Sequence, residues 1–291
     1  MYAHELVNQH KLYPYIALAR MDKPVGYALL LWPTLTALWL AFEGTPPALW
    51  LCVYGLGVIL MRQAGCIMND LADHNFDGAV QRTQHRPLVT QTLTRRQALY
   101  FLGLHLLLAA GLLALCPLHT WPWGFLALGL AILYPFTKRF FAIPQFFLGL
   151  AFSAGIPMAF STAQNTIPHI AWLLVASTLV YALAYDAWYA MVDLPDDEKL
   201  SIHSVALLFK QQTPVFIQGM QLLMVLGYAA IGIAAHFTWP YWSFWGLTIG
   251  LIVYQHLRYK NDYFKAFLHC QWLSFSLFLG TLLQYSLYPL H

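Results

Sequence analysis

The chain has 291 residues, of which 59% are hydrophobic and only 9% are charged, and its formal net charge is +3. Soluble domains usually carry a charge on about a quarter of their residues, so this composition excludes a water-soluble globular protein. The four cysteines are scattered and lack metal-ligand spacing, so we expect neither a disulfide framework nor a zinc site.

Apolar stretches of about the 20 residues that a helix needs to cross a bilayer recur along most of the chain. On that criterion we predict an all-α membrane protein with about nine transmembrane helices, in a single domain over residues 1–291. The predicted spans are 24–43, 48–68, 98–116, 121–137, 143–161, 169–193, 213–236, 241–257 and 267–287.

The basic residues are distributed very unevenly over the loops between these spans. All 15 Lys and Arg lie on the side of the N-terminus or lead toward it, whereas the opposite loops, 43–48, 116–121, 161–168 and 236–240, contain none. Under the positive-inside rule the N-terminus is therefore cytoplasmic, and an odd number of spans places the C-terminus in the periplasm. The prediction is a multi-pass protein of the bacterial inner membrane.

Two acidic clusters stand where the second and the sixth spans reach the cytoplasmic side. In the first, Asp70, Asp73 and Asp77 are spaced three and four residues apart, so that they share one helix face with Asn69. The second cluster consists of Asp186, Asp193, Asp196, Asp197 and Glu198. Because Pro195 interrupts this stretch, its last carboxylates lie either on the same helix face or in a loop past the helix end.

Grouped carboxylates need a positive counter-charge. Like charges about 4 Å apart repel by ~4 kcal/mol at an effective dielectric constant near 20. Along the chain, Arg62 is the only cation close to the first cluster, and Arg82 is the next. One interpretation is a solvated, polar helix end. Two clusters on the same side favour the other, in which carboxylate oxygens bind Mg²⁺ and thereby hold a diphosphate, with the site facing the cytoplasm.

The roles of three arginines, Arg62, Arg82 and Arg86, each allow two interpretations. Arg62 lies two helical turns, ~10 Å, deeper in the membrane than Asn69. A buried arginine costs ~2.5–3.5 kcal/mol on insertion scales, so it needs an anionic partner. That partner is either a cluster aspartate or a substrate carboxylate received by the planar guanidinium. Arg82 and Arg86 either fold over phosphate oxygens or are ordinary inside-positive residues.

The clusters belong to two longer motifs. The first reads NDLADHNFD at 69–77 and continues with RTQHRPL at 82–88, and the second reads YDAWYAMVDLPDD at 185–197. Together they resemble the two signatures of the UbiA superfamily of intramembrane prenyltransferases. The segments DKP, LWPT, YPFTKR and GIPMAF, and the arginine of MRQAGCIMND, resemble the 4-hydroxybenzoate branch of that superfamily.

This resemblance implies helices around a central cavity, with a cytoplasmic cap of short helices and loops. It also implies an enzyme of ubiquinone biosynthesis that transfers a polyprenyl group from polyprenyl diphosphate to the ring of 4-hydroxybenzoate, meta to the carboxylate, and releases diphosphate. Two Mg²⁺ ions are expected to bridge the diphosphate. The implied metal ligands are Asp70, Asp73, Asp77, Asp193, Asp196 and Asp197.

The resemblance assigns roles to further residues. Arg62 is expected to bind the benzoate carboxylate, and it is expected to be catalytic together with Asp70, Asp73 and Asp193. The other implied substrate-binding residues are Asn69, Arg82, Arg86, Tyr134, Lys138, Tyr185, Asp186 and Tyr189. The π-faces of the three tyrosines would stabilise an allylic cation. The expected partners are the two substrates and the lipid bilayer, into which the prenyl chain would leave sideways, and no nucleic acid.

The chain departs from the branch pattern at several positions. These are Trp188, Leu194, Pro195, Ser201, His203 and Gln91. A different aromatic acceptor or a lapsed paralogue therefore remains an alternative. CDP-alcohol phosphotransferases are excluded, because residues 84–133 contain none of the acidic residues that their motif requires. A cation-coupled transporter would place ionisable residues near the bilayer midplane, whereas here they crowd one surface.

Overall fold

The computed structural model describes residues 11–78, 81–199 and 203–289, and every regular element within these ranges is a helix. Ser201 lies outside the described residues. The α-helices are α2 (Tyr13–Leu18), α3 (Val25–Ala41), α4 (Ala48–Asp77), α5 (Arg95–Ala114), α6 (Trp121–Thr137), α7 (Gln145–Ser153), α8 (Gly155–Gln164), α9 (His169–Asp197), α10 (Val205–Phe209), α11 (Thr213–Ala234), α12 (Trp239–Arg258) and α13 (Tyr263–Leu287), and the 3₁₀ turns are η1 (Leu118–Thr120) and η2 (Lys210–Gln212).

A helix or a pair of helices covers each predicted span. Within the described residues, six helical segments are long and apolar enough to cross a membrane, and α3 is a shorter apolar helix. The chain is therefore an integral membrane protein by the length and composition of its helices. The count of about nine spans stays a prediction.

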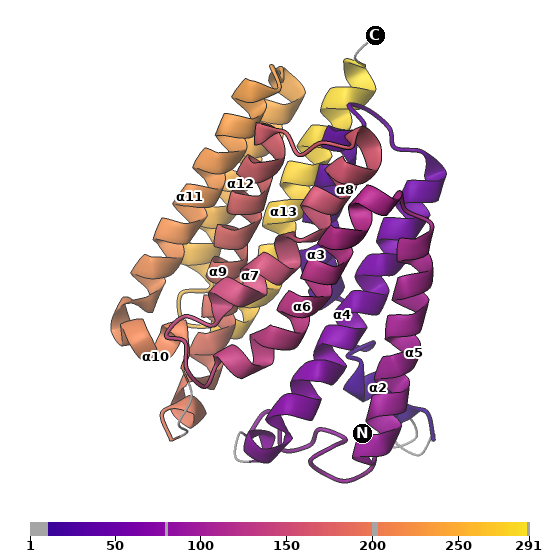
Figure 1. Ribbon diagram of the computed structural model, residues 1–291. Helices are drawn as coiled ribbons and strands as arrows, with labels where there is room; N and C mark the ends of the chain where they lie inside the picture. The colour runs from indigo at the N-terminus through magenta and orange to yellow at the C-terminus, as the bar shows by residue number, and fades with distance from the viewer. Residues whose placement is uncertain (1–10, 79–80, 200–202, 290–291) are drawn as a thin grey trace.

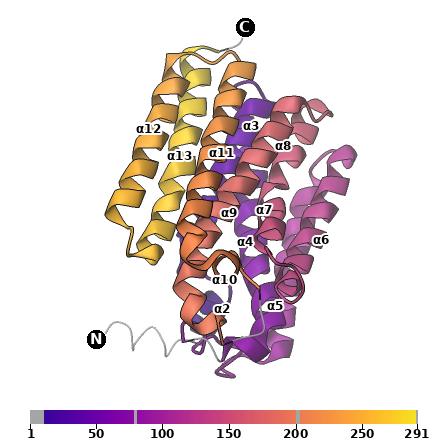
Figure 2. The ribbon, with the colours of Figure 1, turned by 90° about the vertical axis from the view of Figure 1, so that its left-hand side faces the viewer.

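The long helices run roughly side by side in one bundle, with α2 and the C-terminal end of α13 at opposite ends (Figure 1). Helix α9 is central, because it packs against α7, α8, α10, α11 and α13. On one flank of the bundle α12 packs against α13 (Figure 2). On the other, at the right of Figure 1, α4 packs against α3, α5 and α6. The two acidic clusters lie at the end of the bundle where α4 and α9 terminate.

Helix α9 settles the open question about its last carboxylates. It continues through Pro195 to Asp197, so these carboxylates belong to the helix and not to a loop. Pro195 has no N–H to donate to the carbonyl oxygen one turn earlier, so the last turn of α9 lacks one hydrogen bond of the helix but keeps its helical path. The helix therefore carries Asp186, Asp193 and Asp197 toward the same end of the bundle.

The predicted span 143–161 is two helices and not one. Helix α7 ends at Ser153 and α8 begins at Gly155. Pro157 stands in the first turn of α8, where backbone N–H groups have no partner within the helix and a missing N–H costs little. A Cβ atom on Gly155 would lie 3.4 Å from Oγ1 of Thr34, so this break packs closely against α3.

Candidate active site

A cavity of about 830 Å³ opens between the helices. Residues from α3 to α9 and from α13 line it, so it collects side chains from most of the chain. Most of the predicted site residues are on its wall. These are Arg62, Asn69, Asp73, Asp77, Arg82, Arg86, Tyr134, Lys138, Tyr185, Asp186, Tyr189, Asp193 and Asp197.

Two predicted metal ligands do not line the cavity. Asp70 is only 1% exposed and contacts Arg20 and Arg86 behind the wall. Asp196 accepts a hydrogen bond of 3.0 Å from the backbone N–H of Gln81, and one of its oxygens lies 3.4 Å from Nζ of Lys199. The structure therefore separates the four predicted metal ligands that line the cavity from Asp70 and Asp196, whose carboxylates contact other groups of the chain instead.

Cations from outside α4 form ion pairs with the first cluster. Nζ of Lys138 lies 2.8 Å from Oδ2 of Asp73 and donates to Oδ1 of Asn69 at 3.1 Å. Nη1 of Arg86 lies 2.5 Å from Oδ2 of Asp77. The counter-charge that the sequence requires is thus partly supplied by the chain itself, through residues that helix periodicity does not bring near the cluster.

Burial keeps the carboxyl pKa of Asp77 above its usual value despite the ion pair with Arg86. Burial raises the pKa of its carboxyl group, the nearby carboxylates Asp70 and Asp73 raise it further, and Arg86 pulls it back only in part. A carboxylate in such surroundings gains from a further cation.

Arg82 connects the two clusters. Its Nε lies 2.8 Å from Oδ1 of Asp193 and its Nη2 lies 2.6 Å from Oδ2, so the contact is two-pronged. Asp197 is 8% exposed and its side chain makes no hydrogen bond or ion pair within the described residues. The connection after α4 therefore folds over the second cluster. Arg82 contacts a carboxylate of the site. Of the two interpretations of Arg82, this contact disfavours an ordinary inside-positive residue that faces lipid headgroups.

The donor chemistry of the cavity fits Mg²⁺. Asp73, Asp77, Asp193 and Asp197 face one space together with the amide oxygen of Asn69, and hard divalent cations prefer such oxygen ligands. In the described part of the chain, no group of three His, Cys, Asp or Glu side chains is arranged closely enough to hold a metal ion. Three of the four carboxylates are instead occupied by Lys138, Arg86 and Arg82.

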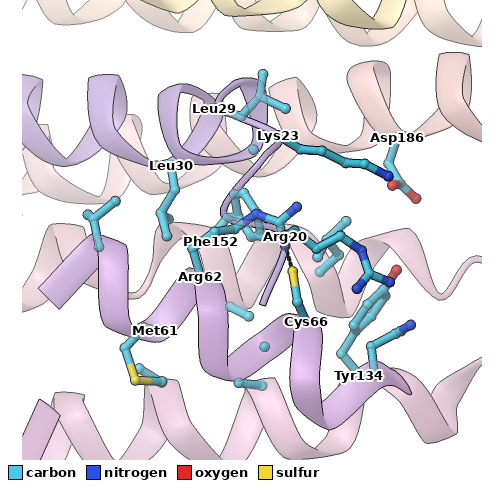
Figure 3. Close-up of a pocket in the computed structure, with 18 of the residues that line it drawn as sticks. Arg20, Lys23, Leu29, Leu30, Met61, Arg62, Cys66, Tyr134, Phe152 and Asp186 are labelled. Carbon is cyan, nitrogen blue, oxygen red and sulfur yellow. Dashed lines mark hydrogen bonds between the residues drawn. The ribbon is translucent and has the colours of Figure 1, made fainter. Parts of the chain in front are cut away.

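Arg62 has no carboxylate partner among the described residues. Its Nη1 donates to Sγ of Cys66 one turn further along α4, and its Nε is buried without a hydrogen-bond partner (Figure 3). The guanidinium lies against Gly26 of α3, where a Cβ atom would overlap it. Of the two partners considered for Arg62, the cluster aspartate is not the one that it contacts. A buried, unpaired N–H on a guanidinium is suited to receive an anion.

Aromatic rings lie between the charged end of the cavity and Arg62. Nζ of Lys138 is 5.5 Å from the ring centre of Tyr134, and Cζ of Arg82 is 4.6 Å from that of Tyr189. The hydroxyl group of Tyr185 is buried without a hydrogen-bond partner. Figure 3 shows Tyr134, Arg62 and Asp186 around the same space. Rings at cation distance show that π-faces are available here to a positive charge.

An apolar extension of the cavity, which we call the α5–α6 arm, runs away from the charged end. It is defined by Leu106, Ala109, Ala110 and Leu113 of α5 and by Gly124, Ala127, Leu128 and Ala131 of α6. These positions recur at intervals of three and four residues, so each set forms one helix face. Ala110 of α5 and Phe125 of α6 both line the cavity and are both exposed, so the two helices do not close the arm off at these residues.

The far end of the arm is polar. Tyr54 and Cys116 line it, and the hydroxyl group of Tyr54 is 2.8 Å from that of Thr162. Asp73 lies 19 residues after Tyr54 on the same helix, and the rise of an α-helix makes this roughly 28 Å. The cavity thus combines a charged mouth, an aromatic middle and a long apolar arm.

Sequence reasoning missed three residues of the site. Arg20 was counted only as an inside-positive residue, and no spacing rule links it to Asp70, 50 positions later. Lys23 also lines the cavity, and burial and the charge of Arg20 lower its pKa. Gln145 accepts a hydrogen bond of 3.3 Å from the backbone N–H of Val205 and interacts with Asp186. A polar residue in an apolar stretch was the available signal for Gln145.

The amino-acid sequence has extensive relatives. Residues 30–268 match the model of the UbiA prenyltransferase family. A protein of Alcanivorax borkumensis named 4-hydroxybenzoate octaprenyltransferase is 46% identical over 279 residues, which cover 94% of this chain and 96% of the relative. A protein of Hydrogenovibrio crunogenus with the same name is 44% identical over 283 residues, which cover 96% of this chain and 99% of the relative.

Solved structures share the fold. The apo structure of a UbiA homologue from Aeropyrum pernix K1 has a TM-score of 0.79 at 19% identity, and the match covers 89% of this chain and 98% of that one. A UbiA homologue from Archaeoglobus fulgidus, bound to GPP and Mg²⁺, has a TM-score of 0.71 at 16% identity, with coverages of 92% and 99%. The helical arrangement described above is therefore that of UbiA homologues.

Proposed function

The chain belongs to the UbiA prenyltransferase family, and from that premise we propose that it transfers a polyprenyl group from polyprenyl diphosphate to 4-hydroxybenzoate, with release of diphosphate, in ubiquinone biosynthesis. The single observation that carries the proposal is the cavity that joins carboxylates and arginines at its mouth to an apolar arm. Its relatives named for this activity match nearly the whole chain.

Mg²⁺ would be held by the cavity-facing carboxylates of Asp73, Asp77, Asp193 and Asp197, and when bound it would neutralise the diphosphate. We propose two ions, because these carboxylates come from two helices. The Archaeoglobus homologue, whose structure is bound to GPP and Mg²⁺ together, supports this use of metal. Asp70 and Asp196 are not placed in this ligand set, since neither lines the cavity.

The basic groups of the site would bind the leaving diphosphate. Arg82, Arg86 and Lys138 already stand among the carboxylates, and each can turn its donors to phosphate oxygens once those carboxylates take up metal. The carbon–oxygen bond to the prenyl group then breaks, and diphosphate keeps the bonding electrons. The rings of Tyr134, Tyr185 and Tyr189 would stabilise the allylic cation that remains.

Arg62 would bind the carboxylate of the acceptor and so direct the opposite end of the ring toward the allylic cation. The ring carbon next to the phenol oxygen forms the new carbon–carbon bond, and the same carbon loses its proton so that aromaticity returns. The prenyl chain would lie in the α5–α6 arm, whose apolar faces match it and whose outer opening gives it a path from the bilayer.

We further propose one intramembrane domain over residues 1–291 with nine spans, a cytoplasmic N-terminus and a periplasmic C-terminus. The mouth of the cavity and its cap, which includes α10, would then face the cytoplasm. The absence of Lys and Arg from the opposite loops of the sequence supports this orientation.

The test is a transfer assay with purified protein in detergent, 4-hydroxybenzoate and a prenyl diphosphate. The expected result is prenylated 4-hydroxybenzoate and an equal amount of diphosphate, both dependent on Mg²⁺. Asp193→Asn should lower the rate by about 10²-fold or more, since it removes the charge of a proposed metal ligand and of the partner of Arg82. A wild-type protein that releases no diphosphate, or releases it equally well in excess chelator, would refute the proposal.

A further inference from the structure

Asp70 differs from the other carboxylates of the first cluster in its surroundings. It is 1% exposed and both of its oxygens contact arginines. Arg20 provides two contacts, Nη2 to Oδ1 at 2.6 Å and Nη1 to Oδ2 at 3.0 Å. Arg86 provides a third, Nη1 to Oδ1 at 3.0 Å. To bind a metal ion, this carboxylate would have to give up charge-assisted hydrogen bonds that are made out of reach of water.

Arg20 has an unusual backbone conformation and a side chain with several hydrogen-bond partners. Its φ is 56°, in the left-handed region that non-glycine residues rarely adopt. Its Nη1 also donates a hydrogen bond of 3.0 Å to the carbonyl oxygen of Leu18. Unfavourable backbone conformations persist where the surrounding contacts impose them, and they gather at functional sites. The guanidinium is thus hydrogen-bonded both to the carbonyl oxygen of Leu18 and to the carboxylate of Asp70.

The two arginines, unlike Asp70, face the cavity. Arg86 contacts both Asp70 and Asp77 through the same Nη1, so its Nε and Nη2 make no hydrogen bond within the described residues. A guanidinium has five N–H donors in a planar arrangement that matches phosphate oxygens. One buried carboxylate therefore contacts two guanidinium groups, both of which line the cavity in which the diphosphate is expected.

We propose that Asp70 is a positioning residue which holds Arg20 and Arg86 as a two-arginine clamp for the diphosphate, and that it is not itself a metal ligand. This inference rests on the proposed function, because the ligand of the clamp is the diphosphate of that substrate. It divides the first acidic motif into two tasks. Asp73 and Asp77 line the cavity and would bind metal, whereas Asp70 would hold Arg20 and Arg86 in position.

A binding measurement without turnover tests the clamp. The probe is inorganic pyrophosphate, which has no prenyl chain and needs no acceptor, and the buffer contains EDTA so that metal does not contribute. Pyrophosphate should raise the Tm of the wild-type protein and of Asp73→Asn. Asp70→Asn should bind it about tenfold more weakly or worse, because both guanidinium groups lose their anchor. Lys265→Gln is the control, since neither Lys265 nor its partner Asp262 lines the cavity, and it should keep the full shift.

Kinetics with geranyl diphosphate, 4-hydroxybenzoate and varied Mg²⁺ give a second readout. A merely structural role of Asp70 would not change KM for the diphosphate while sparing the Mg²⁺ requirement. Asp70→Asn should raise KM for the diphosphate and leave the Mg²⁺ concentration at half-maximal rate unchanged. Asp73→Asn should raise that Mg²⁺ concentration. The clamp is overturned if Asp70→Asn needs more Mg²⁺ and still binds pyrophosphate as the wild-type protein does.

Arg20→Gln repeats the test if Asp70→Asn does not fold, because it removes one half of the clamp and leaves Asp70 charged. The clamp predicts weaker pyrophosphate binding for this variant. If Asp70 were a metal ligand, freeing it from Arg20 would lower the Mg²⁺ requirement and leave pyrophosphate binding intact. A wild-type protein that binds pyrophosphate without metal but transfers no prenyl group would refute the proposed function and support the clamp.

Discussion

Arg82 and Asp193 form a two-pronged ion pair between residues 111 positions apart in the chain. Arg82 lies in the connection between α4 and α5, and Asp193 lies on α9, so this pair joins the two acidic clusters. The same guanidinium lies over the ring of Tyr189. One side chain thus contacts a carboxylate that would bind metal and a ring that would face the allylic cation.

Replacement of Arg82 should therefore affect the diphosphate more than the acceptor. In Arg82→Ala we expect kcat/KM for the prenyl diphosphate to fall about tenfold or more, since the variant cannot donate a charge-assisted hydrogen bond to the phosphate. Arg82→Lys keeps the charge without the planar fork and should recover only part of the activity. Steady-state kinetics with each substrate varied in turn measure both effects. An equal loss for the two substrates would contradict this assignment.

Arg62 should determine the use of the acceptor. Removal of a charge-assisted hydrogen bond from a buried site costs a few kcal/mol, so Arg62→Ala should lower kcat/KM for 4-hydroxybenzoate by roughly 10²-fold or more. Preference for this acid over the uncharged 4-hydroxybenzamide should shrink, and Arg62→Lys should recover part of the activity. Kinetics against both acceptors give the answer. If Arg62 only balances the aspartates, the Mg²⁺ and diphosphate dependence would change instead and the acceptor preference would not.

Gly26→Ala should imitate the loss of Arg62 without removing its charge. The added Cβ atom would overlap the guanidinium, which then has to leave its place beside α3. We expect lower kcat/KM for 4-hydroxybenzoate and little further loss when Arg62→Ala is added, because interacting residues are not additive. Gly129→Ala on α6, where a Cβ atom would meet nothing, is the matched control. Additive losses in the double variant would show that Gly26 acts elsewhere.

Bulky residues placed at two depths of the α5–α6 arm should limit the length of the prenyl chain. Ala127 and Ala131 line the arm on α6, and Ala131 lies one turn, ~6 Å, nearer to Tyr134. Ala127→Phe should impair octaprenyl diphosphate and spare geranyl diphosphate, while Ala131→Phe should also impair farnesyl diphosphate. Gly129→Phe points to the outer surface of the same helix and should leave the preference unchanged. Ratios of kcat/KM across the three chain lengths are the measurement.

Reporter fusions check the orientation. Alkaline phosphatase fused to the C-terminus should be active, because this enzyme matures only outside the cytoplasm, and a fusion in the connection between α12 and α13 should be inactive. The charges of Arg258, Lys260 and Lys265 around that connection are the reason for the second expectation. Activity in the reverse pattern would overturn both the number of spans and the cytoplasmic position of the cavity mouth.

Much of the helical framework could be predicted from local sequence alone. Helix α6 covers the predicted span 121–137 residue for residue, because its limits coincide with changes in polarity. Helix α4 runs nine residues beyond its predicted span end at 68, to Asp77, since a helix need not end where the membrane does. The break between α7 and α8 was missed because both helices are apolar, and a hydrophobic pattern does not record where one apolar helix ends and the next begins.

The residues of the site were predictable as a set, but their partners were not. Helix periodicity placed Asp73 and Asp77 on a common face, and both line the cavity. The same periodicity placed Asp70 with them, yet the contact with Arg20 turns it to the back of the wall. Pairs such as Lys138 and Asp73, 65 positions apart, arise only when the bundle closes. One amino-acid sequence taken by itself contains no signal for that closure.

The outward opening of the α5–α6 arm has a consequence for binding strength. Because Ala110 and Phe125 line the arm and are exposed, we expect the acyl chains of neighbouring lipids to fill an arm that holds no substrate. A prenyl chain that enters then exchanges one hydrocarbon environment for another, and little apolar surface is withdrawn from water. The free energy of substrate recognition must therefore come from the charged end of the molecule, while lipid competes for the arm in proportion to its abundance. Membrane composition would act on this enzyme as a competitive ligand does.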